Sequence, residues 1–411
     1  MRVVVIGSGL LGVATSWFLN KNGATVTVVD RQDQAAMETS HANAGMLNPS
    51  MADPWNAPGI VRKILRNIGH ADSAIQLRPA ALPSMLGWLL GFFRYAKADL
   101  YYRNTLRNVA LGKYSLLTWQ ALCDELAIEH DRKFNGTLKI FRDQQSLEYF
   151  TKMAELMAQE GVEFVAMDAR QTVALEPSLL AIEGQLTGSL HFPADRSGDA
   201  RKFCQGLAHH AEHAGVDFQF NTVVKKIEHA DHRILSILTS AGQITADAFV
   251  VAAGSYSPKL LAPLGIRLPV RPVKGYSITI PTPDWAVPPL RPIIDETPHI
   301  AATPYHHRLR VAGTAELAGY DRRVQNDRIN GLVHFTHSLF PDLPVDPGVQ
   351  EIEPWSGLRP VSIDGMGIMG KTPYHNLYLN TGHCHLGWTM SSGAGKPGSR
   401  THAATLETTL L

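Results

Sequence analysis

The chain has 411 residues, of which 45% are hydrophobic and 18% are charged, and its formal net charge is +1. This length suits two joined domains with sizeable cores rather than one small core. The near-zero charge, without any block of like charges, speaks against a nucleic-acid partner and against an acidic tail.

The three cysteines, Cys123, Cys204 and Cys384, lie far apart in the sequence. An odd and scattered set argues against a disulfide framework, and without a CxxC pair nothing suggests zinc. The N-terminus starts directly with a strand pattern and shows neither a separate apolar segment nor a cleavage site, so it does not indicate a signal peptide. We therefore expect a cytoplasmic protein.

A nucleotide-binding pattern opens the chain. Arg2–Ile6 is an apolar, β-branched run typical of a buried parallel strand. The glycine-rich turn Gly7–Gly12 (GSGLLG) follows, and a helical pattern runs over Leu10–Leu19. A second strand is predicted over Thr25–Val29 and ends in Asp30. This is the order of a GxGxxG dinucleotide fingerprint.

Each part of the fingerprint has a physical task. Gly7 permits the tight turn, Gly9 lets a pyrophosphate approach the backbone, and Gly12 lets the helix pack close to the strand. The helix N-terminus offers free N–H groups to the phosphates, and Asp30 can accept hydrogen bonds from the ribose. We predict an adenine-dinucleotide site that disfavours NADP, whose 2′-phosphate Asp30 would repel. A structural turn without a ligand is the alternative.

Two later segments favour FAD over NAD. Ala248–Gly254 (AFVVAAG) reads as a buried strand ending in glycine, and the strand-like run Phe218–Ile227 precedes it. We expect this strand to pack beside the first βαβ unit, although any buried strand that stops at glycine would look similar. A glycine-dense turn follows the strand predicted at Leu377–Asn380. Its N–H groups could stabilise the negative charge that a flavin gains on reduction.

The most apolar segment is Leu82–Tyr95 (LPSMLGWLLGFFRY). It is shorter than the roughly 18–20 apolar residues that a membrane span requires. A buried helix is the simpler interpretation. A helix lying on a membrane surface is the alternative, because Trp88, Phe92, Phe93, Arg94 and Tyr95 suit an interface.

Together these motifs resemble the flavoprotein (small) subunit of bacterial D-amino acid dehydrogenase, within the glycine and D-amino acid oxidase superfamily. Besides the fingerprint, the matching segments are Glu38–Gly45 (ETSHANAG), Gly188–Leu207, Lys274–Ser277 (KGYS), Trp355–Gly370 and Asn380–Trp388. The tail departs from the family, because Pro397-Gly398 breaks any helix begun at Ser391. Cys384 stands where the family usually has glycine.

The resemblance implies an α/β, two-domain FAD-dependent oxidoreductase, with a Rossmann-like FAD domain and an α+β substrate domain containing a mainly antiparallel sheet. The FAD domain would be assembled from residues 1–80, 185–270 and 345–411, the last with an atypical C-terminal tail. The substrate domain would comprise residues 81–184 and 271–344. These boundaries follow from the family and not from the periodicity of this sequence.

The implied reaction is oxidative deamination of a D-amino acid. Hydride leaves the substrate Cα for flavin N5, the imine hydrolyses to a 2-oxo acid and ammonia, and electrons pass to a quinone or another respiratory acceptor. A quinone acceptor would bring the protein to the inner face of the cell membrane as a peripheral protein. Two alternatives stay open: a glycine or sarcosine oxidase that uses oxygen, and a flavin subunit that is not itself catalytic.

Arg359, in the GLRP sequence, is the expected partner of the substrate carboxylate, because arginine forms a bidentate pair with a carboxylate. Tyr276 could donate its hydroxyl to the same carboxylate; a structural arginine and a core tyrosine are the alternatives. His383 and His385, like His209, His210 and His213, lack the further ligands of a metal site. We expect noncovalent FAD to be held by Val5, Ile6, Gly7, Gly9, Leu10, Leu11, Gly12, Asp30, Arg31, Thr39, Ser40, Asn43, Ala44, Gly45, Val224, Ala253, Gly254, Gly387 and Trp388.

Overall fold

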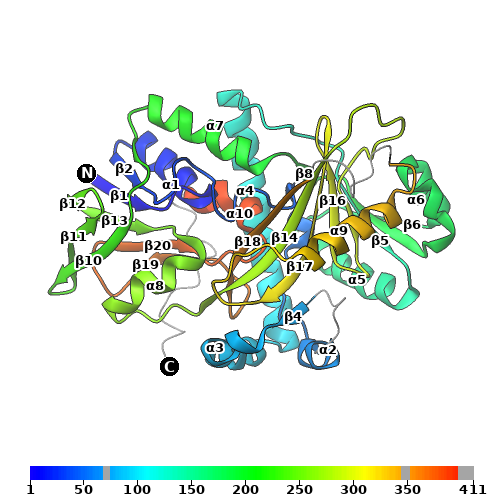
Figure 1. Cartoon of the computed structure of the whole chain (residues 1–411), viewed down its shortest axis with the longest axis horizontal. Coiled ribbons are helices and arrows are strands. Elements are labelled where there is room, and N and C mark those ends of the chain that lie inside the picture. The colour runs from blue at the N-terminus through cyan, green and yellow to red at the C-terminus, as the bar shows by residue number, and fades with distance from the viewer. Residues whose placement is uncertain (68–74, 344–351, 397–411) are drawn as a thin grey trace.

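The computed structural model describes residues 1–67, 75–343 and 352–396. Two large sheets lie side by side, a six-stranded sheet on the left of Figure 1 and a nine-stranded sheet on its right. The expected combination of a Rossmann-like unit with an α+β unit rich in antiparallel strands is confirmed.

The six-stranded sheet has the order β19-β20-β13-β1-β2-β9. Every neighbouring pair is parallel except β19–β20. The first two strands have the bounds that the sequence predicts, and the returning strand β13 pairs directly with β1 as expected. The bounds are β1 (Arg2–Ile6), β2 (Thr25–Val29), β9 (Asp217–Gln219), β13 (Ala248–Val251), β19 (Ile368–Lys371) and β20 (Leu377–Thr381).

Apolar layers cover both faces of this sheet. One core joins it to helices α1 (Leu10–Lys21) and α7 (Ala200–His213) and to the side chain of Trp388. A second core lies under helix α8 (Ser257–Leu261) and a small antiparallel sheet. The strands of that small sheet are β10 (Val224–Ala230), β11 (Arg233–Thr239) and β12 (Gly242–Ile244).

The single strand expected over Phe218–Ile227 is wrong. The run divides into β9, which closes the edge of the six-stranded sheet, and β10, which belongs to the small sheet. Between them Asn221 adopts a left-handed conformation with φ of +53°. Asparagine tolerates this conformation better than most residues, so the chain can turn here despite the β-branched residues that follow.

The larger sheet runs β18-β14-β17-β16-β15-β5-β7-β6, and β4 pairs with β17. Only β15–β5 and β17–β4 are parallel pairs. The strands are β4 (Ile75–Leu77), β5 (Thr137–Phe141), β6 (Val165–Met167), β7 (Gly188–Phe192), β14 (Val270–Pro281), β15 (Ile293–Asp295), β16 (Ile300–Pro304), β17 (Arg308–Leu317) and β18 (Glu353–Ser362). Helices α5 (Gln144–Ala158), α6 (Ala169–Leu175) and α9 (Asn326–Leu339) accompany these strands.

The strands cross the domain boundaries that the resemblance implied. Those boundaries assign β4, β7 and β18 to the FAD-binding unit, whereas all three strands belong to the nine-stranded sheet. Conversely, the long helix α4 (Ala98–Leu126), expected in the substrate unit, contributes Trp119 and Leu122 to the core of the six-stranded sheet. A two-stranded ladder of β3 (Met46–Leu47) and β8 (Arg196–Ser197) also links distant parts of the chain.

The apolar segment forms helix α3 (Leu82–Arg94), which lies with α2 (Ile60–Asn67) at the lower edge of Figure 1. Trp88 and Phe92 do not face an interface, because both are buried against the sheet, and Trp88 Nε1 donates to Val361 O at 3.1 Å. The exposed large apolar residues of the helix are Leu86 and Leu90, which are 54% and 72% exposed. Thus the buried helix is confirmed, and the assignment of Trp88 and Phe92 to a membrane surface is wrong. Of the other residues named for such a surface, Phe93 and Tyr95 are half-buried and Arg94 is exposed.

The C-terminal helix α10 (Gly387–Gly395) fills the space between α1 and α4. A Cβ atom on Gly393 would lie 2.9 Å from Ser115, and one on Gly395 would lie 2.7 Å from the carbonyl carbon of Ala14. The glycines therefore allow backbone-to-backbone packing that larger residues would prevent. The helix ends ahead of Pro397, and the rest of the tail lies outside the described residues.

Gly395 offers a direct test of this packing. Gly395→Ala should lower the free energy of unfolding by about 1–3 kcal/mol, because its methyl group would press on the backbone of α1. Gly331 in α9 is the matched control, since nothing lies within 4 Å of its added Cβ. Gly331→Ala should instead stabilise by about 0.5–1 kcal/mol. Urea unfolding of both variants checks this; equal behaviour of the two would contradict the close contact between α10 and α1.

Candidate active site

A cavity of about 1280 Å³ lies where the two sheets meet. It exceeds the roughly 300–1,000 Å³ of an ordinary ligand pocket, as a site for a dinucleotide together with a substrate should. All of the expected cofactor residues line it except Val5 and Gly12, and both expected substrate residues, Arg359 and Tyr276, also border it.

The glycine-rich turn forms one end of the cavity. Gly7 has a φ of +110°, and a Cβ atom there would lie 2.7 Å from Ala252 O, directly after the returning strand β13. A Cβ atom on Gly12 would lie 1.8 Å from Gly7 O. Gly12 and the fully buried Val5 therefore support the turn from behind rather than face the cavity. Only glycine fits at these two turn positions.

The N-terminus of α1 opens into the same end. Gly9 is its N-cap and supplies no capping side chain, and no acidic residue occupies the first turn. Leu10 N–H donates to Ser40 Oγ at 3.2 Å, and Asp30 accepts from the N–H and the hydroxyl of Ser8 at 2.6 and 2.8 Å. The helix thus presents its positive end to the cavity, while the Asp30 carboxylate is held beside the turn.

Glu38 is a cavity residue for which the sequence suggested no individual role. It forms ion pairs with Arg31 at 2.5 Å and with Arg322 at 3.1 Å. The Arg31 guanidinium in turn lies 3.8 Å from the centre of the Tyr256 ring. These contacts connect the loop after β2 to the segment after β13. The matching run ETSHANAG contained Glu38, but only its small polar residues had been assigned to the cofactor.

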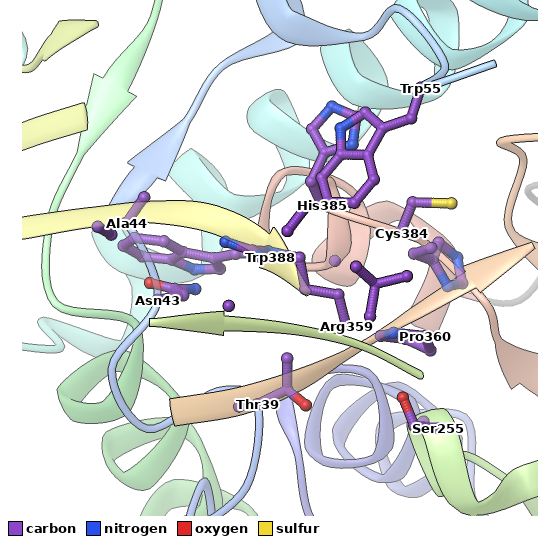
Figure 2. Close-up of a pocket in the computed structure, with 18 of the residues that line it drawn as sticks. Thr39, Asn43, Ala44, Trp55, Ser255, Arg359, Pro360, Cys384, His385 and Trp388 are labelled. Carbon is purple, nitrogen blue, oxygen red and sulfur yellow. The ribbon is translucent and has the colours of Figure 1, made fainter. Parts of the chain in front are cut away.

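The middle of the cavity is built by several loops that converge in Figure 2. Thr39 Oγ1 and Ser255 Oγ both donate to Leu358 O at 2.8 Å, which ties three segments together. Asn43 Oδ1 accepts from Gly45 N at 2.9 Å, and Trp388, in the first turn of α10, lies near Asn43 and Ala44 in Figure 2. Thr39, Asn43, Ala44 and Trp388 are thus gathered in one place from opposite ends of the chain.

Several buried polar atoms around this cavity have no hydrogen-bond partner within the described part of the chain. They are Thr314 Oγ1, His383 Nδ1 and Nε2, His385 Nδ1 and Trp388 Nε1. Buried polar groups are nearly always paired in folded proteins. Unpaired donors and acceptors beside a glycine-lined phosphate cradle therefore fit a polar, dinucleotide-sized cofactor.

Arg359 projects from β18 into the cavity (Figure 2). Its Nη1 donates to Thr314 O at 2.9 Å, and its guanidinium lies 5.6 Å from the centre of the Trp55 ring. Within residues 1–67, 75–343 and 352–396, no carboxylate comes within ion-pair distance of it. Burial lowers the pKa of Arg359 to about 10, so it remains a cation at neutral pH.

The structure does not bring the Tyr276 hydroxyl to Arg359. On β14, Val273 pairs with Arg359 and Tyr276 pairs with Ser356, so Tyr276 and Arg359 project from opposite faces of the sheet. Tyr276 is 1% exposed, and its hydroxyl donates to Glu316 Oε2 at 2.5 Å. The expected shared contact with a substrate carboxylate is therefore corrected. Tyr276 is fixed to Glu316 on the far face.

His383 and His385 lie beside the cavity, as expected of a loop near the cofactor. His385 Nε2–H donates to Met51 O at 2.8 Å, and its ring stacks on Trp55 at 5.4 Å. Burial lowers the pKa of His383 to about 4, so this imidazole is neutral at physiological pH. Trp55 carried no signal in the sequence, because nothing local marks a loop tryptophan as a wall of a cavity.

The far end of the cavity is polar. Tyr101 donates to Asp53 at 3.3 Å and contacts the hydroxyl of Tyr149, while Lys139 and Glu296 form a buried ion pair at 3.4 Å. These side chains come from two loops, two helices and one strand that are distant in sequence, so no motif unites them. In the described residues, no group of three or more metal-ligating side chains is placed to hold an ion.

Comparison with known proteins gives this geometry a family. The profile described as "DAO: FAD dependent oxidoreductase" matches residues 2–397. The chain belongs to this family of FAD-dependent oxidoreductases. The match ends at Pro397, inside the segment 392–411 in which a departure from the family is expected from the sequence.

Relatives with similar sequences cover almost the whole chain. A protein of Vibrio vulnificus named D-amino acid dehydrogenase is 41% identical over 395 residues, which is 96% of this chain and 94% of that protein. One of Granulibacter bethesdensis with the same name is 42% identical over 396 residues, with the same coverage.

Solved structures share the fold at lower identity. Glycine oxidase from Bacillus cereus superposes with a TM-score of 0.72 at 22% identity, covering 96% of this chain and 93% of that protein. L-proline dehydrogenase from P. horikoshii superposes with a TM-score of 0.73 at 18% identity, covering 96% of this chain and 91% of that protein.

Cys384 lines the cavity, and a cysteine thiol there is a candidate for a covalent bond to the flavin. Its thiol lies 3.4 Å from Ser362 Oγ and donates to Gly382 O at 3.6 Å. Burial raises the pKa of this thiol to about 11, so the reactive thiolate is scarce at neutral pH. We therefore expect the FAD of this DAO-family protein to be held without a covalent bond.

Acid precipitation of the purified holoenzyme should leave yellow FAD in the supernatant. Cys384→Ser should contain the same amount of flavin per chain as the wild type, because no bond to sulfur holds the cofactor. Absorbance of supernatant and pellet checks both statements. Flavin that stays in the wild-type pellet but leaves the Cys384→Ser pellet would establish a cysteinyl link instead.

Proposed function

We propose that this protein is an FAD-dependent D-amino acid dehydrogenase that converts a D-amino acid to a 2-oxo acid and ammonia. The observation that carries the proposal is Arg359, a half-buried cation that lines the cavity and has no carboxylate within ion-pair distance among the described residues. A substrate with a single carboxylate completes such a site. The preference for the D-enantiomer is supported by the names of the relatives.

FAD, when bound, supplies the hydride acceptor. The chain's own residues hold the substrate: Arg359 fixes its carboxylate, and that anchor sets where Cα lies. Trp55 and His385 form a stacked wall beside the guanidinium and limit the access of water. His383 is neutral at physiological pH, so it places no additional positive charge near an amine that must lose its proton before oxidation.

The electron acceptor is inferred from the dehydrogenase name of the relatives and from the chemistry of a respiratory quinone. A glycine or sarcosine oxidase is the alternative, because the chain shares its fold with glycine oxidase. The two enzymes differ in a measurable product, because an oxidase releases peroxide and a dehydrogenase reduces a dye or quinone without oxygen.

A panel of D- and L-amino acids, with glycine and sarcosine, tests the proposal on the holoenzyme. We expect D-amino acids to reduce a redox dye anaerobically, with little peroxide formed in air. Arg359→Leu should retain FAD but lose on the order of 2–5 kcal/mol of transition-state stabilisation, measured as kcat/KM, since it removes one partner of a buried charge pair. Arg359→Lys should lose less, because it keeps the charge without the bidentate geometry.

Two outcomes would contradict the proposal. Oxidation of L-amino acids or sarcosine in preference to D-amino acids would assign another substrate. Near-normal kcat/KM in Arg359→Leu would make Arg359 a structural residue. The FAD content of each variant, read from its visible spectrum, separates a lost substrate contact from a lost cofactor.

A quinone is dissolved in the bilayer, so we also propose peripheral contact with the inner face of the cell membrane through α3. No described helix is both long and apolar enough to cross a membrane. The support for contact is the exposed pair Leu86 and Leu90, one turn apart on α3, with Arg94 exposed at the end of the same helix. An apolar face beside a cation suits a lipid headgroup region.

Leu86→Ser combined with Leu90→Ser should reduce co-sedimentation with vesicles of phosphatidylethanolamine and phosphatidylglycerol, because it removes the apolar area that would enter the interface. The matched control is Leu117→Ser with Leu180→Ser, two leucines that are 73% and 64% exposed elsewhere on the surface. The control should sediment like the wild type. Equal sedimentation of all three proteins, or of none, would remove α3 as the anchor.

A further inference from the structure

Glu316 is a buried carboxylate on β17 that binds three partners. It is 1% exposed, and it accepts a hydrogen bond from Tyr276 at 2.5 Å. Lys274 Nζ, which is fully buried, lies 3.1 Å from it, and Arg78 forms a further ion pair. Lys274 and Tyr276 are the first and third residues of the KGYS sequence, so both point to the face of β14 that is turned away from Arg359.

A β-bulge lies directly beside Glu316. On β14 and β17, Tyr276 pairs with Gly313 and Lys274 pairs with Glu316. One residue of β14, Gly275, therefore faces two residues of β17, Thr314 and Ala315. Thr314 has a φ of +61°, a conformation that a β-branched residue rarely adopts. A conformation of this kind persists only where neighbouring contacts hold it.

This bulge and Gly275 together form the seat of Arg359. The carbonyl of Thr314 accepts from Arg359 Nη1 at 2.9 Å. A Cβ atom on Gly275 would lie 2.1 Å from the same nitrogen, so the guanidinium rests directly on the backbone of β14. Both contacts depend on where β14 and β17 lie relative to each other at the bulge.

We propose that Glu316, with Lys274 and Tyr276, is a positioning group that holds the Thr314 bulge and thereby orients Arg359 for a carboxylate. The inference rests on the proposed function only in taking Arg359 as the carboxylate-binding residue. Tyr276 and Lys274 act from one face of the sheet, and the guanidinium is seated on the other. The cluster contributes to binding without touching the substrate.

A purely structural cluster would behave differently. Buried ion pairs often contribute little specific stabilisation, and removing one partner lowers the stability of the whole fold. Such a loss would lower Tm without a selective effect on carboxylate binding. A positioning role instead requires that the effect on binding pass through Arg359, so that it disappears when Arg359 is absent.

The test uses the FAD-loaded holoenzyme and benzoate, a planar monocarboxylate whose binding is read from the flavin absorbance. Tyr276→Phe removes only the hydroxyl that Glu316 accepts and should weaken benzoate binding by about 3–10-fold, as the loss of one hydrogen bond does. Tyr374→Phe is the matched control, because Tyr374 is also a buried tyrosine whose hydroxyl is bonded, here to Leu264 O at 3.0 Å, and it lies outside the cavity.

In the Arg359→Leu background, Tyr276→Phe should add no further loss of benzoate affinity. Glu316→Gln, which keeps an acceptor oxygen but removes the charge, provides a second variant if Tyr276→Phe folds poorly, and it should also raise the Kd for benzoate. FAD content and Tm are measured for every protein. For any oxidisable substrate, KM should rise more than kcat falls.

The results separate the two proposals. If Arg359→Leu weakens benzoate binding while Tyr276→Phe and Glu316→Gln bind it like the wild type and Tyr374→Phe, the positioning role is overturned and Arg359 keeps its assignment. A full effect of Tyr276→Phe without Arg359 would overturn it as well. If Arg359→Leu binds benzoate normally, Arg359 is not the carboxylate site, and both the proposed anchor and the positioning role fail.

Discussion

A half-buried cation, Arg359, that has no anionic partner among residues 1–67, 75–343 and 352–396 is the constraint on which the site depends. Removing a guanidinium from water is costly unless its hydrogen bonds and charge are compensated. Arg359 donates one hydrogen bond to the Thr314 carbonyl and has a flat aromatic neighbour in Trp55. Neither contact neutralises its charge. The remaining compensation is left to a bound carboxylate, which gives a ligand of that kind an advantage over neutral molecules.

Placing such a group between two sheets requires backbone contacts that are closer than ordinary side chains permit. Gly7 and Gly12 bring the first helix against the two central strands, and Gly275 lets the Arg359 guanidinium lie on β14. Gly393 and Gly395 bring α10 against α4 and α1 in the same manner. The elements around the cavity are therefore packed more closely than they could be with a side chain at these positions.

The sequence predicted the structural features that depend on residues adjacent in the chain. It did not predict the features that depend on contacts with residues distant in the sequence. The strands Arg2–Ile6 and Thr25–Val29 and the glycine turn are local patterns, and their predicted bounds are confirmed. Trp88 and Phe92 look suited to an interface, but the sheet beneath α3 buries them. Trp55 and the polar far end of the cavity could not be predicted, since no local spacing records that separate loops, helices and strands converge.

Tyr276 shows the same limit at the scale of one strand. In KGYS, neighbouring residues alternate between the two faces of β14, so a motif that borders a substrate site cannot send all its side chains into that site. Gly275 serves the cavity by having no side chain, while Lys274 and Tyr276 bind Glu316 on the other face. From the composition of the motif, the Tyr276 hydroxyl was expected to donate a hydrogen bond to the substrate carboxylate. The register decides against this role for the hydroxyl. Tyr276 pairs with Ser356, whereas Val273 pairs with Arg359, so the Tyr276 and Arg359 side chains lie on opposite faces of the sheet. A motif of this kind marks a strand that supports the site from both faces. The missing side chain of Gly275 on one face matters as much as the side chains of Lys274 and Tyr276 on the other.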